Sequence, residues 1–290
     1  MVLTVVTATY NCISSGNREN LIRSIESVSR LNVSHEHLIY DGASKDGTVE
    51  LLLELERTTP GLKVTSEPDT GIYNALNKGV RDAKGEWFYV LGADDYICDA
   101  NRLANLIENE SLETQVIIAP VSHDGEMYQY HGMCDLKWIF WRHPYCHQGV
   151  IARTCIIRRY GGFDETFRLC ADGDLCLKFH EDALCFHYTE DEFTNYAHGG
   201  VSDTNGKEVW GEVTCFLQKH LGMTNAEAVR FRQVGAPPLR TMITKLWHRD
   251  IAFRIGARFM IRRWISYRVR QPFRRMPSSW KCLIKRLVQK

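Results

Sequence analysis

Residues 85–95 read Gly-Glu-Trp-Phe-Tyr-Val-Leu-Gly-Ala-Asp-Asp, and this stretch decides the fold class that we assign to the chain. Trp87–Leu91 is an apolar and aromatic run with the length of a buried strand, and two adjacent carboxylates, Asp94 and Asp95, follow it closely. Acids at the end of a core strand are costly to leave unpaired, so they favour a hard cation or a ligand at that position. A helix cap or a turn is the alternative, because aspartate is common in both.

The composition is that of a folded protein. The chain has 290 residues, 44% of them hydrophobic, which is enough for one large domain with a sizeable core. Its ten cysteines are scattered from Cys12 to Cys282 without a CxxC pair, and no signal peptide precedes the first strand. We therefore expect reduced thiols and a cytoplasmic protein. No apolar run approaches the roughly 20 residues that a transmembrane helix needs.

Strand and helix patterns alternate through the first hundred residues. Predicted strands cover residues 3–8, 37–40, 62–66 and 87–91, and predicted helices cover 20–30, 49–56 and a segment that begins at Ile72. In that last segment, apolar residues recur at i, i+3, i+4, i+7 and i+8, which indicates one buried face. The alternation is typical of an α/β fold with a mostly parallel central sheet and helices on both faces.

A polar cluster follows each of these predicted strands. The clusters are Thr7–Asn11, Asp41–Ser44, Glu67–Gly71 and Asp94–Asp95. Ligands of open α/β sheets bind outside the carboxyl ends of the strands, so four clusters at one edge predict a binding site there. The chain contains neither G-x-G-x-x-G after the first strand nor G-x-x-x-x-G-K-[ST], so a bound diphosphate would need a metal to neutralise its charge.

The second half carries three further motifs. They are Tyr-Cys-His-Gln-Gly-Val at 145–150, Gly-Gly-Phe-Asp-Glu at 161–165 and Cys-Ala-Asp-Gly-Asp-Leu at 170–175. Asp172 opens a predicted helix that runs to Glu181, where a carboxylate also serves simply as a helix cap. His147 lies beside aromatic residues such as Tyr145, so a hydrogen-bonded core histidine and an acceptor-site residue are equally good interpretations.

Taken in order and spacing, these motifs resemble those of the family 2 glycosyltransferases, which have a GT-A type fold and use a nucleotide-diphospho-sugar donor. The segments that carry the resemblance are 7–11, 41–48, 69–73, 77–79 and 85–95. The similarity is greatest to bacterial enzymes of colanic-acid and O-antigen biosynthesis. It implies a Rossmann-like, mostly parallel central sheet. It also implies inverting transfer of a sugar, from a UDP-sugar by default, to a glycan or polyprenyl-linked acceptor in surface polysaccharide biosynthesis.

The resemblance also implies roles for single residues. Asp172 would be the catalytic base, and Asp94 and Asp95 would hold Mg²⁺ or Mn²⁺. His147 and Gln148 would lie on the acceptor side. The nucleotide-sugar donor would contact Thr7, Thr9, Asp41, Asp69, Lys78 and Asp94.

Two positions depart from the family pattern. Gly42 stands where the family often has a second acid, and Gly92 stands where the first acid of a D-x-D motif is found. These departures keep open the alternative of a non-catalytic nucleotide-sugar-binding relative. A nucleotidyltransferase that makes the sugar nucleotide is a further alternative, which the missing Gly-rich phosphate loop disfavours.

The C-terminal segment is strongly basic. Residues 240–290 carry 15 Lys or Arg and one acid, Asp250, although the net charge of the whole chain is +1. Over 242–290, aromatic and aliphatic residues are interleaved with arginine, which suits an interfacial element on an anionic membrane surface. A helical hairpin packed on the catalytic domain is the alternative. Nucleic acid is a poorer partner because no nucleic-acid motif accompanies the charge, so we expect a peripheral protein on the inner face of the cell membrane.

These patterns divide the chain into three segments. We expect residues 1–115 to form the nucleotide-sugar-binding half of a GT-A domain and residues 116–235 to form its acceptor-binding half. Residues 236–290 are expected to be a basic helical extension.

Overall fold

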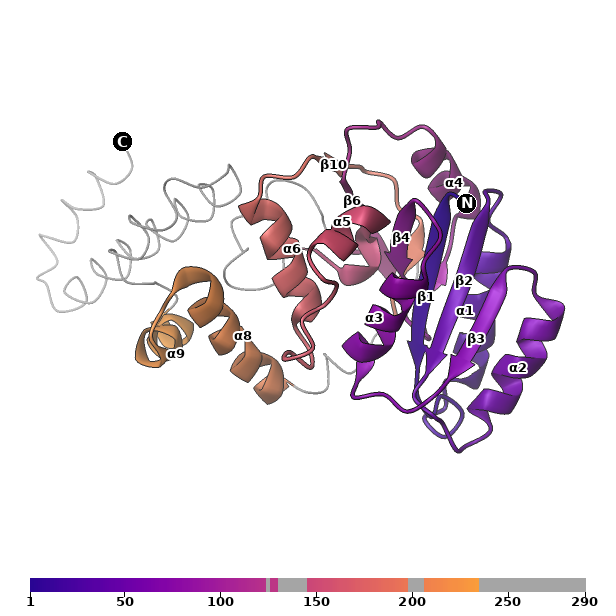
Figure 1. Cartoon of the computed structure of the whole chain (residues 1–290), viewed down its shortest axis with the longest axis horizontal. Helices are drawn as coiled ribbons and strands as arrows, with labels where there is room; N and C mark the ends of the chain where they lie inside the picture. Colours follow the sequence, from indigo (N-terminus) through magenta and orange to yellow (C-terminus); the bar gives the residue numbers. More distant parts are fainter. Residues whose placement is uncertain (124–125, 130–144, 198–205, 235–290) are drawn as a thin grey trace, which may run out of the picture. The chain divides into compact units, whose positions relative to one another are not determined.

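The computed structural model describes residues 1–123, 126–129, 145–197 and 206–234 (Figure 1). It contains two compact units, of which the first comprises Met1–Asp135 and His143–Glu212. Residues 213–234 are the described part of the second unit. The basic extension predicted at 236–290, with its membrane segment at 242–290, lies outside the described residues.

The elements of the first unit alternate as predicted over the first hundred residues. In chain order they are β1 (Leu3–Thr9), α1 (Arg18–Ser29), β2 (His35–Asp41), α2 (Thr48–Thr58), β3 (Leu62–Ser66), α3 (Ile72–Asp82), β4 (Trp87–Val90), β5 (Tyr96–Ile97), α4 (Ala100–Glu108), β6 (Val116–Ile118), β7 (Val121–His123), β8 (Glu126–Gln129), η2 (His147–Gly149), β9 (Val150–Arg153), α5 (Thr154–Arg159), α6 (Ala171–Glu181), β10 (Phe186–Tyr188) and β11 (Thr194–Asn195).

A seven-stranded sheet forms the centre of the first unit. Its strand order is β10-β6-β9-β4-β1-β2-β3, and β9 alone among these strands runs antiparallel to its neighbours. The prediction of a mostly parallel α/β sheet is therefore confirmed. The boundary predicted at residue 115 falls between α4 and β6 of this unit, so the division into donor and acceptor halves stays a prediction about binding roles.

A second, smaller sheet has the order β5-β11-β7-β8. Its strands are short, and β11 pairs antiparallel with β5 and parallel with β7. This sheet brings the chain after β11 next to the end of β4, since the backbone N–H of Ala197 donates to Oδ1 of Asp95 at 2.8 Å.

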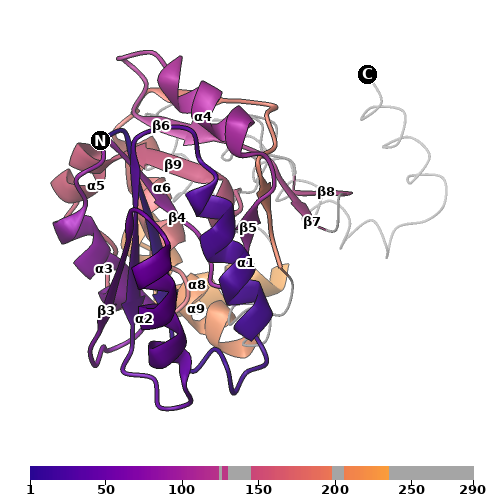
Figure 2. The same ribbon diagram turned by 90° about the vertical axis from the view of Figure 1, so that its right-hand side faces the viewer.

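Both faces of the central sheet are covered by helices (Figures 1 and 2). Trp87 and Tyr89 of β4 point to one face, because side chains alternate along a strand, and they join a buried cluster with residues of α1 and α4. Phe88 and Val90 point to the other face, where they line a small cavity with residues of α5 and α6. The Trp87–Leu91 run is thus apolar throughout because both of its faces are buried, as in the interior of parallel sheets.

Helix α3 packs closely on β1 and β2. A Cβ atom added to Gly79 would lie 2.5 Å from Cγ1 of Val6, so only glycine lets the helix approach β1 this closely. Ala75, Leu76 and Val80 of its apolar face are buried as the periodicity predicts. Ile72, the first residue of that pattern, is instead 50% exposed, so the buried face begins one turn later.

The start of α2 differs from what its sequence favours. Aspartate and threonine are common N-caps, so the Asp-Gly-Thr run at 46–48 favours Asp46 or Thr48 in that role. The N-cap is instead Gly47, whose backbone is left-handed with φ of 94°. Asp46 lies one residue earlier, and its Oδ1 accepts from the N–H of Thr48 at 3.1 Å. The carboxylate therefore still satisfies a free N–H of the first helical turn.

Two helices belong wholly or partly to the second unit. Helix α8 (Gly206–Leu221) starts in the first unit and ends in the second, and α9 (Asn225–Val234) follows it. Within the described residues, we find no helix that combines the length and the apolar character needed to cross a membrane.

Candidate active site

Four neighbouring parallel strands carry the predicted polar clusters. Because β4, β1, β2 and β3 lie side by side and run parallel, their carboxyl ends meet at one edge of the sheet. We call the loops at this edge, residues 9–17, 41–48, 66–71 and 91–95, the rim. The N–H of Asn11 donates to Oγ of Ser44, and the N–H of Ser14 donates to Oδ2 of Asp46, each at 2.7 Å. Polar side chains of the 41–48 motif therefore tie the first two loops together.

Asp41 is the most heavily hydrogen-bonded acid of the rim. Its carboxylate is 1% exposed and accepts from Thr9 at 3.2 Å, from Oγ of Ser44 at 2.5 Å and from Oγ of Ser66 at 2.9 Å. The N–H of Ser44 is a fourth donor, at 2.8 Å. Both carboxylate oxygens of Asp41 are thus hydrogen-bonded, and Thr9 and Asp41 are buried at the base of the rim loops. Their contact with a nucleotide stays a prediction.

Thr7 lies two residues before Thr9 in β1, so both side chains point to the same face of the sheet. Thr7 is fully buried, and its hydroxyl is hydrogen-bonded to Nε2 of His37 at 2.9 Å. Burial lowers the pKa of His37 to about 3, so the imidazole stays neutral in this pair. The structure therefore gives the Thr7 hydroxyl a protein partner and does not bring it to the surface of the rim.

Asp69 and Lys78 lie at the loop after β3. Oδ1 of Asp69 accepts from the N–H of Gly71 at 2.9 Å, which shapes the start of α3. Lys78 reaches back from α3 to the same loop, where Nζ lies 2.8 Å from Oε1 of Glu67 and donates to the carbonyl of Pro68 at 3.3 Å. The structure thus brings both predicted donor residues to the rim.

Tyr10 is an exposed aromatic side chain that lies near Asp69. Tyr10 is 66% exposed at the end of β1, and a Cβ atom on Gly42 would lie 3.2 Å from its ring and 2.9 Å from Oδ2 of Asp69. Gly42 is therefore the position that lets Tyr10 and Asp69 approach each other. The family's second acid would not fit here without moving one of them.

The two carboxylates that follow β4 are electrostatically strained. Asp95 is 1% exposed, and burial, with repulsion from Asp94, raises its pKa to about 7. Burial also raises the pKa of Asp94. Gln148 lies near enough to favour the charged form of Asp95 but makes no hydrogen bond to Oδ2, which has no partner among the described residues. A buried, unsatisfied carboxylate oxygen is expected where a cation or ligand completes a site.

Gly92 leaves the space for such a cation. A Cβ atom there would lie 2.3 Å from Oδ2 of Asp95 and 3.1 Å from Oδ1 of Asp94, so any side chain would intrude between the two carboxylates. No group of three or more His, Cys, Asp or Glu within the described residues is placed to hold a metal. Mg²⁺ commonly takes one or two carboxylates and completes its shell with water and substrate phosphates. The pair therefore fits a metal shared between the protein and a diphosphate.

Asn77 connects α3 to the Gly-Gly-Phe-Asp-Glu turn. Its side chain donates to the carbonyl of Phe163 at 2.8 Å and to Oε1 of Glu165 at 2.7 Å, and it accepts from the N–H of Phe163 at 2.8 Å. Asn74 adds a bond to Oε2 of Glu165 at 2.9 Å. The 161–165 motif thus binds the polar side chains of α3. Asp164 stabilises its own turn, since its Oδ1 accepts from the N–H of Thr166 at 3.0 Å.

Asp172 lies in the first turn of α6. The N-cap of this helix is Cys170, so Asp172 is not the N-cap. Asp172 and Asp174 both lie in the first turn, where a carboxylate is favoured by the positive end of the helix. Oδ1 of Asp172 accepts from the hydroxyl of Tyr73 at 2.9 Å, and its Oδ2 lies 3.9 Å from Nδ1 of His147. The side chains of Asp172 and His147 are each 20% exposed, so the carboxylate is sheltered yet accessible.

Two consecutive residues of η2, His147 and Gln148, interact with Asp172 and with Asp95, respectively. His147 contacts Asp172 and packs edge-on against Phe163, with ring centroids 5.9 Å apart. Gln148, the next residue, interacts with Asp95. A cavity of about 20 Å³ beside them is lined by His147 and Asp172 and also by Val90, the last residue of β4. The structure therefore brings Asp172 and the Asp94–Asp95 pair to the same side of the unit.

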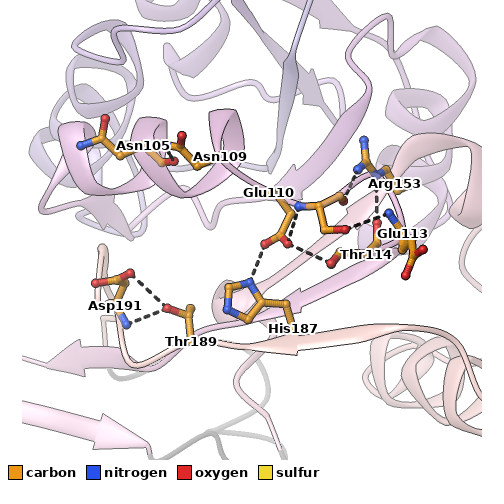
Figure 3. A network of polar contacts seen from close by, with 10 residues as sticks. Asn105, Asn109, Glu110, Glu113, Thr114, Arg153, His187, Thr189 and Asp191 are labelled. Atoms are coloured by element: carbon orange, nitrogen blue, oxygen red, sulfur yellow. Dashed lines mark hydrogen bonds and ion pairs between the residues drawn. The ribbon is translucent and has the colours of Figure 1, made fainter.

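A larger cavity, of about 610 Å³, lies elsewhere, between α4 and the loop after β10 (Figure 3). In it, the carboxylate of Glu110 accepts from Thr114 and is bonded to Nδ1 of His187. Helix α4 lies beside the N-terminus of the chain, just before β1 begins, so this cavity lies towards the amino ends of the parallel strands (Figures 1 and 2). Thr189 also donates to Asp191 here, at 3.1 Å. None of the predicted site residues lines this cavity.

Sequence patterns do not reveal three of these contributions. The bond from Tyr73 to Asp172 and the interaction of Gln148 with Asp95 each join distant segments. The exposure of Tyr10 depends on how the loops around it fold. The motifs flagged each segment, but only the fold pairs them.

Comparison with known proteins identifies the family of the chain. The profile described as "Glycosyl transferase family 2" matches residues 4–158, which is more than half of the chain. A "PGL/p-HBAD biosynthesis glycosyltransferase" of Mycobacterium bovis is 28% identical over 174 residues, covering 58% of this chain and 68% of that protein.

Solved structures show the same fold. S. aureus TarS 1-349 in complex with UDP-GlcNAc has a TM-score of 0.61 at 16% identity, covering 92% of each chain. The mannosyltransferase PcManGT from Pyrobaculum calidifontis, in complex with GDP-Man and Mn2+, has a TM-score of 0.59 at 17% identity and covers 89% of this chain and 73% of that one. The chain therefore belongs to glycosyltransferase family 2 and is a glycosyltransferase of the GT-A type fold.

Proposed function

We propose that this enzyme transfers a sugar, with inversion, from a nucleotide-diphospho-sugar to a glycan or lipid-linked acceptor in surface polysaccharide biosynthesis. Asp172 is the general base, and the rim holds the donor. One observation carries the proposal: His147 and Gln148 are adjacent in η2, and one contacts Asp172 while the other interacts with Asp95. A base and a diphosphate site on the same short turn suit an acceptor and a donor that meet there.

The acceptor hydroxyl is expected to approach from the side of His147. Asp172 takes its proton as the acceptor oxygen attacks the anomeric carbon, and the bond from that carbon to the diphosphate breaks on the opposite side. The electron pair leaves with the nucleoside diphosphate. A single displacement of this kind inverts the anomeric configuration.

Asp94 and Asp95 are the residues that would hold Mg²⁺ or Mn²⁺. The metal, when bound, neutralises the charge of the leaving diphosphate. The raised pKa of Asp95 and the space at Gly92 support this assignment. PcManGT, a structural neighbour, is in complex with Mn2+, which also supports it.

The donor base has an aromatic surface to pack on. Tyr10 is the exposed ring of the rim, beside Asp69 and Gly42, and exposed aromatic faces bind planar bases by stacking. Uridine is the default base, since TarS structures contain UDP and UDP-GlcNAc. Lys78 lines the same site through its bonds to the loop after β3.

Replacing Tyr10 tests this arrangement. We expect Tyr10→Ala to weaken the binding of UDP in the presence of Mn²⁺ about tenfold, because stacking on a base contributes roughly 1–3 kcal/mol. Isothermal titration calorimetry measures the affinity. Leu112→Ala, which removes another exposed apolar side chain away from the rim, is the matched control and should leave it unchanged. Equal affinities of wild type and Tyr10→Ala would contradict the stacking role.

The basic segment 242–290 is proposed to place the enzyme on the inner face of the cell membrane, next to a polyprenyl-linked acceptor. We expect the full chain to co-sediment with vesicles that contain phosphatidylglycerol and not with pure phosphatidylcholine vesicles. Binding should fall steeply between 0.1 and 0.5 M NaCl, because salt screens surface charge. Absence of binding to anionic vesicles at low salt would contradict this placement.

The activity is tested with radiolabelled donors and a bacterial membrane extract that supplies the acceptor. The donor panel consists of UDP-glucose, UDP-galactose, UDP-GlcNAc and GDP-mannose. We expect Mn²⁺-dependent incorporation of label from one donor into the extract. Failure of every donor, in an extract that does support transfer by other enzymes, would count against a surface-polysaccharide role.

A further inference from the structure

Tyr73 is a buried side chain of α3 that neither the donor site nor the metal site uses. Its hydroxyl donates a hydrogen bond to Oδ1 of Asp172, with an O···O distance of 2.9 Å. The two residues are 99 positions apart in the chain and belong to α3 and α6. Tertiary structure, and not local sequence, therefore brings this phenol to the proposed base.

The orientation of Tyr73 is strongly constrained. The residue is 7% exposed, and its ring stacks on that of Phe163 with centroids 5.7 Å apart. Asn77, one helical turn further along α3, binds both the N–H and the carbonyl of Phe163. Any sliding of α3 along the 161–165 turn would break these bonds, so the hydroxyl is held in one place relative to Asp172.

The phenol acts here as a hydrogen-bond donor. Burial, together with the negative charge of Asp172, raises the pKa of Tyr73 well above its ordinary value, so the hydroxyl keeps its proton. A donor of this kind stabilises the ionised form of a carboxylate. The titratable groups that interact with Asp172 also include His147, Cys170 and Cys176.

We propose that Tyr73 is a positioning residue that holds Oδ1 of Asp172 and keeps the carboxylate ionised and oriented towards the acceptor. This inference rests on the proposed role of Asp172 as the base. The acceptor proton passes to Asp172, the bond between the acceptor oxygen and the anomeric carbon forms, and the bond to the diphosphate breaks. Tyr73 retains its own proton throughout and does not touch the reacting atoms.

The variant Tyr73→Phe removes the hydroxyl and keeps the ring that stacks on Phe163. The full chain is labelled with ¹³C at the aspartate carboxyls, and the resonance missing from Asp172→Asn is assigned to Asp172. We expect Tyr73→Phe to move the titration midpoint of this resonance upward by about one pH unit, because a hydrogen bond to a charged group is worth roughly 1.5–3 kcal/mol. Transfer in the donor panel above should fall about tenfold, with donor affinity unchanged.

Tyr160→Phe is the matched control. It also removes a tyrosine hydroxyl that donates to an aspartate, Oδ2 of Asp182 at 2.5 Å, and its ring likewise packs on a phenylalanine, Phe179. This variant should leave both the Asp172 midpoint and transfer unchanged. A purely structural role of Tyr73 would instead lower the melting temperature and the donor affinity together.

Adding Tyr73→Phe to Asp172→Asn tests whether the two residues act as one unit. We expect no further loss of transfer in the double variant. A further tenfold loss, or an unchanged midpoint in Tyr73→Phe, overturns the inference even when Asp172→Asn alone is inactive. Wild-type transfer by Asp172→Asn would instead overturn the proposed function, so the two failures are distinguishable.

Discussion

Asp172→Asn is expected to lose sugar transfer by about 1000-fold while it binds the donor as wild type does. A general base contributes roughly 10²–10⁴-fold to a rate, and an amide does not take the proton of the acceptor hydroxyl. Asparagine retains an oxygen that accepts from Tyr73, so the bond at 2.9 Å between α3 and α6 is kept. The protein should therefore fold normally, and the loss should appear in kcat and not in the affinity for UDP.

Transfer of radiolabel measures the first quantity, and calorimetric titration with UDP and Mn²⁺ measures the second. Asp182→Asn is the control, because Asp182 follows the other end of the same helix and accepts a hydrogen bond from Tyr160. It should transfer at the wild-type rate. If Asp172→Asn transfers as fast as Asp182→Asn, Asp172 has no part in the mechanism.

Asp95→Asn is expected to stabilise the metal-free protein at pH 8 and, at the same time, to abolish metal-dependent donor binding. Burial, with repulsion from Asp94, raises the pKa of Asp95 from 3.8 to about 7. Between these two pH values the folded protein keeps a proton that the unfolded chain has lost. The free energy of unfolding of the wild type therefore falls as the pH rises from about 4 to about 7, and this contribution stays constant above that range.

Asparagine carries no charge to desolvate and keeps an oxygen for the N–H of Ala197. We expect Asp95→Asn to be more stable than wild type at pH 8 by on the order of 2 kcal/mol, and equally stable near pH 4. Urea unfolding in EDTA measures this. Asp191→Asn, at an exposed aspartate, should follow the wild-type curve at every pH. If the free energy of unfolding of wild type and of Asp95→Asn changes with pH in the same way, the pKa of Asp95 is not raised in the folded protein.

Much of the fold follows from patterns within short windows of sequence. The four strands and three helices of the first hundred residues are predicted because their apolar periodicity is long and regular. The strands of the second sheet are missed because they are short: β5 and β11 have two residues each, β7 has three and β8 has four, which is too few to show a clear period. Ala197 reaches Asp95 through that sheet, so this part of the proposed metal site depends on tertiary contacts.

The candidate site shows the same division. Asp94 and Asp95 stand out because two acids closely follow a fully apolar strand. Tyr73 and Asn77 lie outside the apolar face of α3 that the periodicity predicts. Both are nevertheless buried, because the 161–165 turn covers that side of the helix. Thr7 differs from its prediction in the other direction. Its motif predicts contact with a ligand, but its hydroxyl is hydrogen-bonded to His37 of the neighbouring strand. Contacts between segments far apart in the chain decide each of these cases.

The central claim is that the rim binds a nucleoside diphosphate through a metal held by Asp94 and Asp95. Isothermal titration of the wild-type chain with UDP, and in parallel with GDP, in Mn²⁺ or in EDTA tests it most directly. We predict that one of the two nucleotides binds in Mn²⁺ and that its affinity falls at least tenfold in EDTA. Equal affinity in Mn²⁺ and EDTA, or no binding of either nucleotide, would contradict the claim.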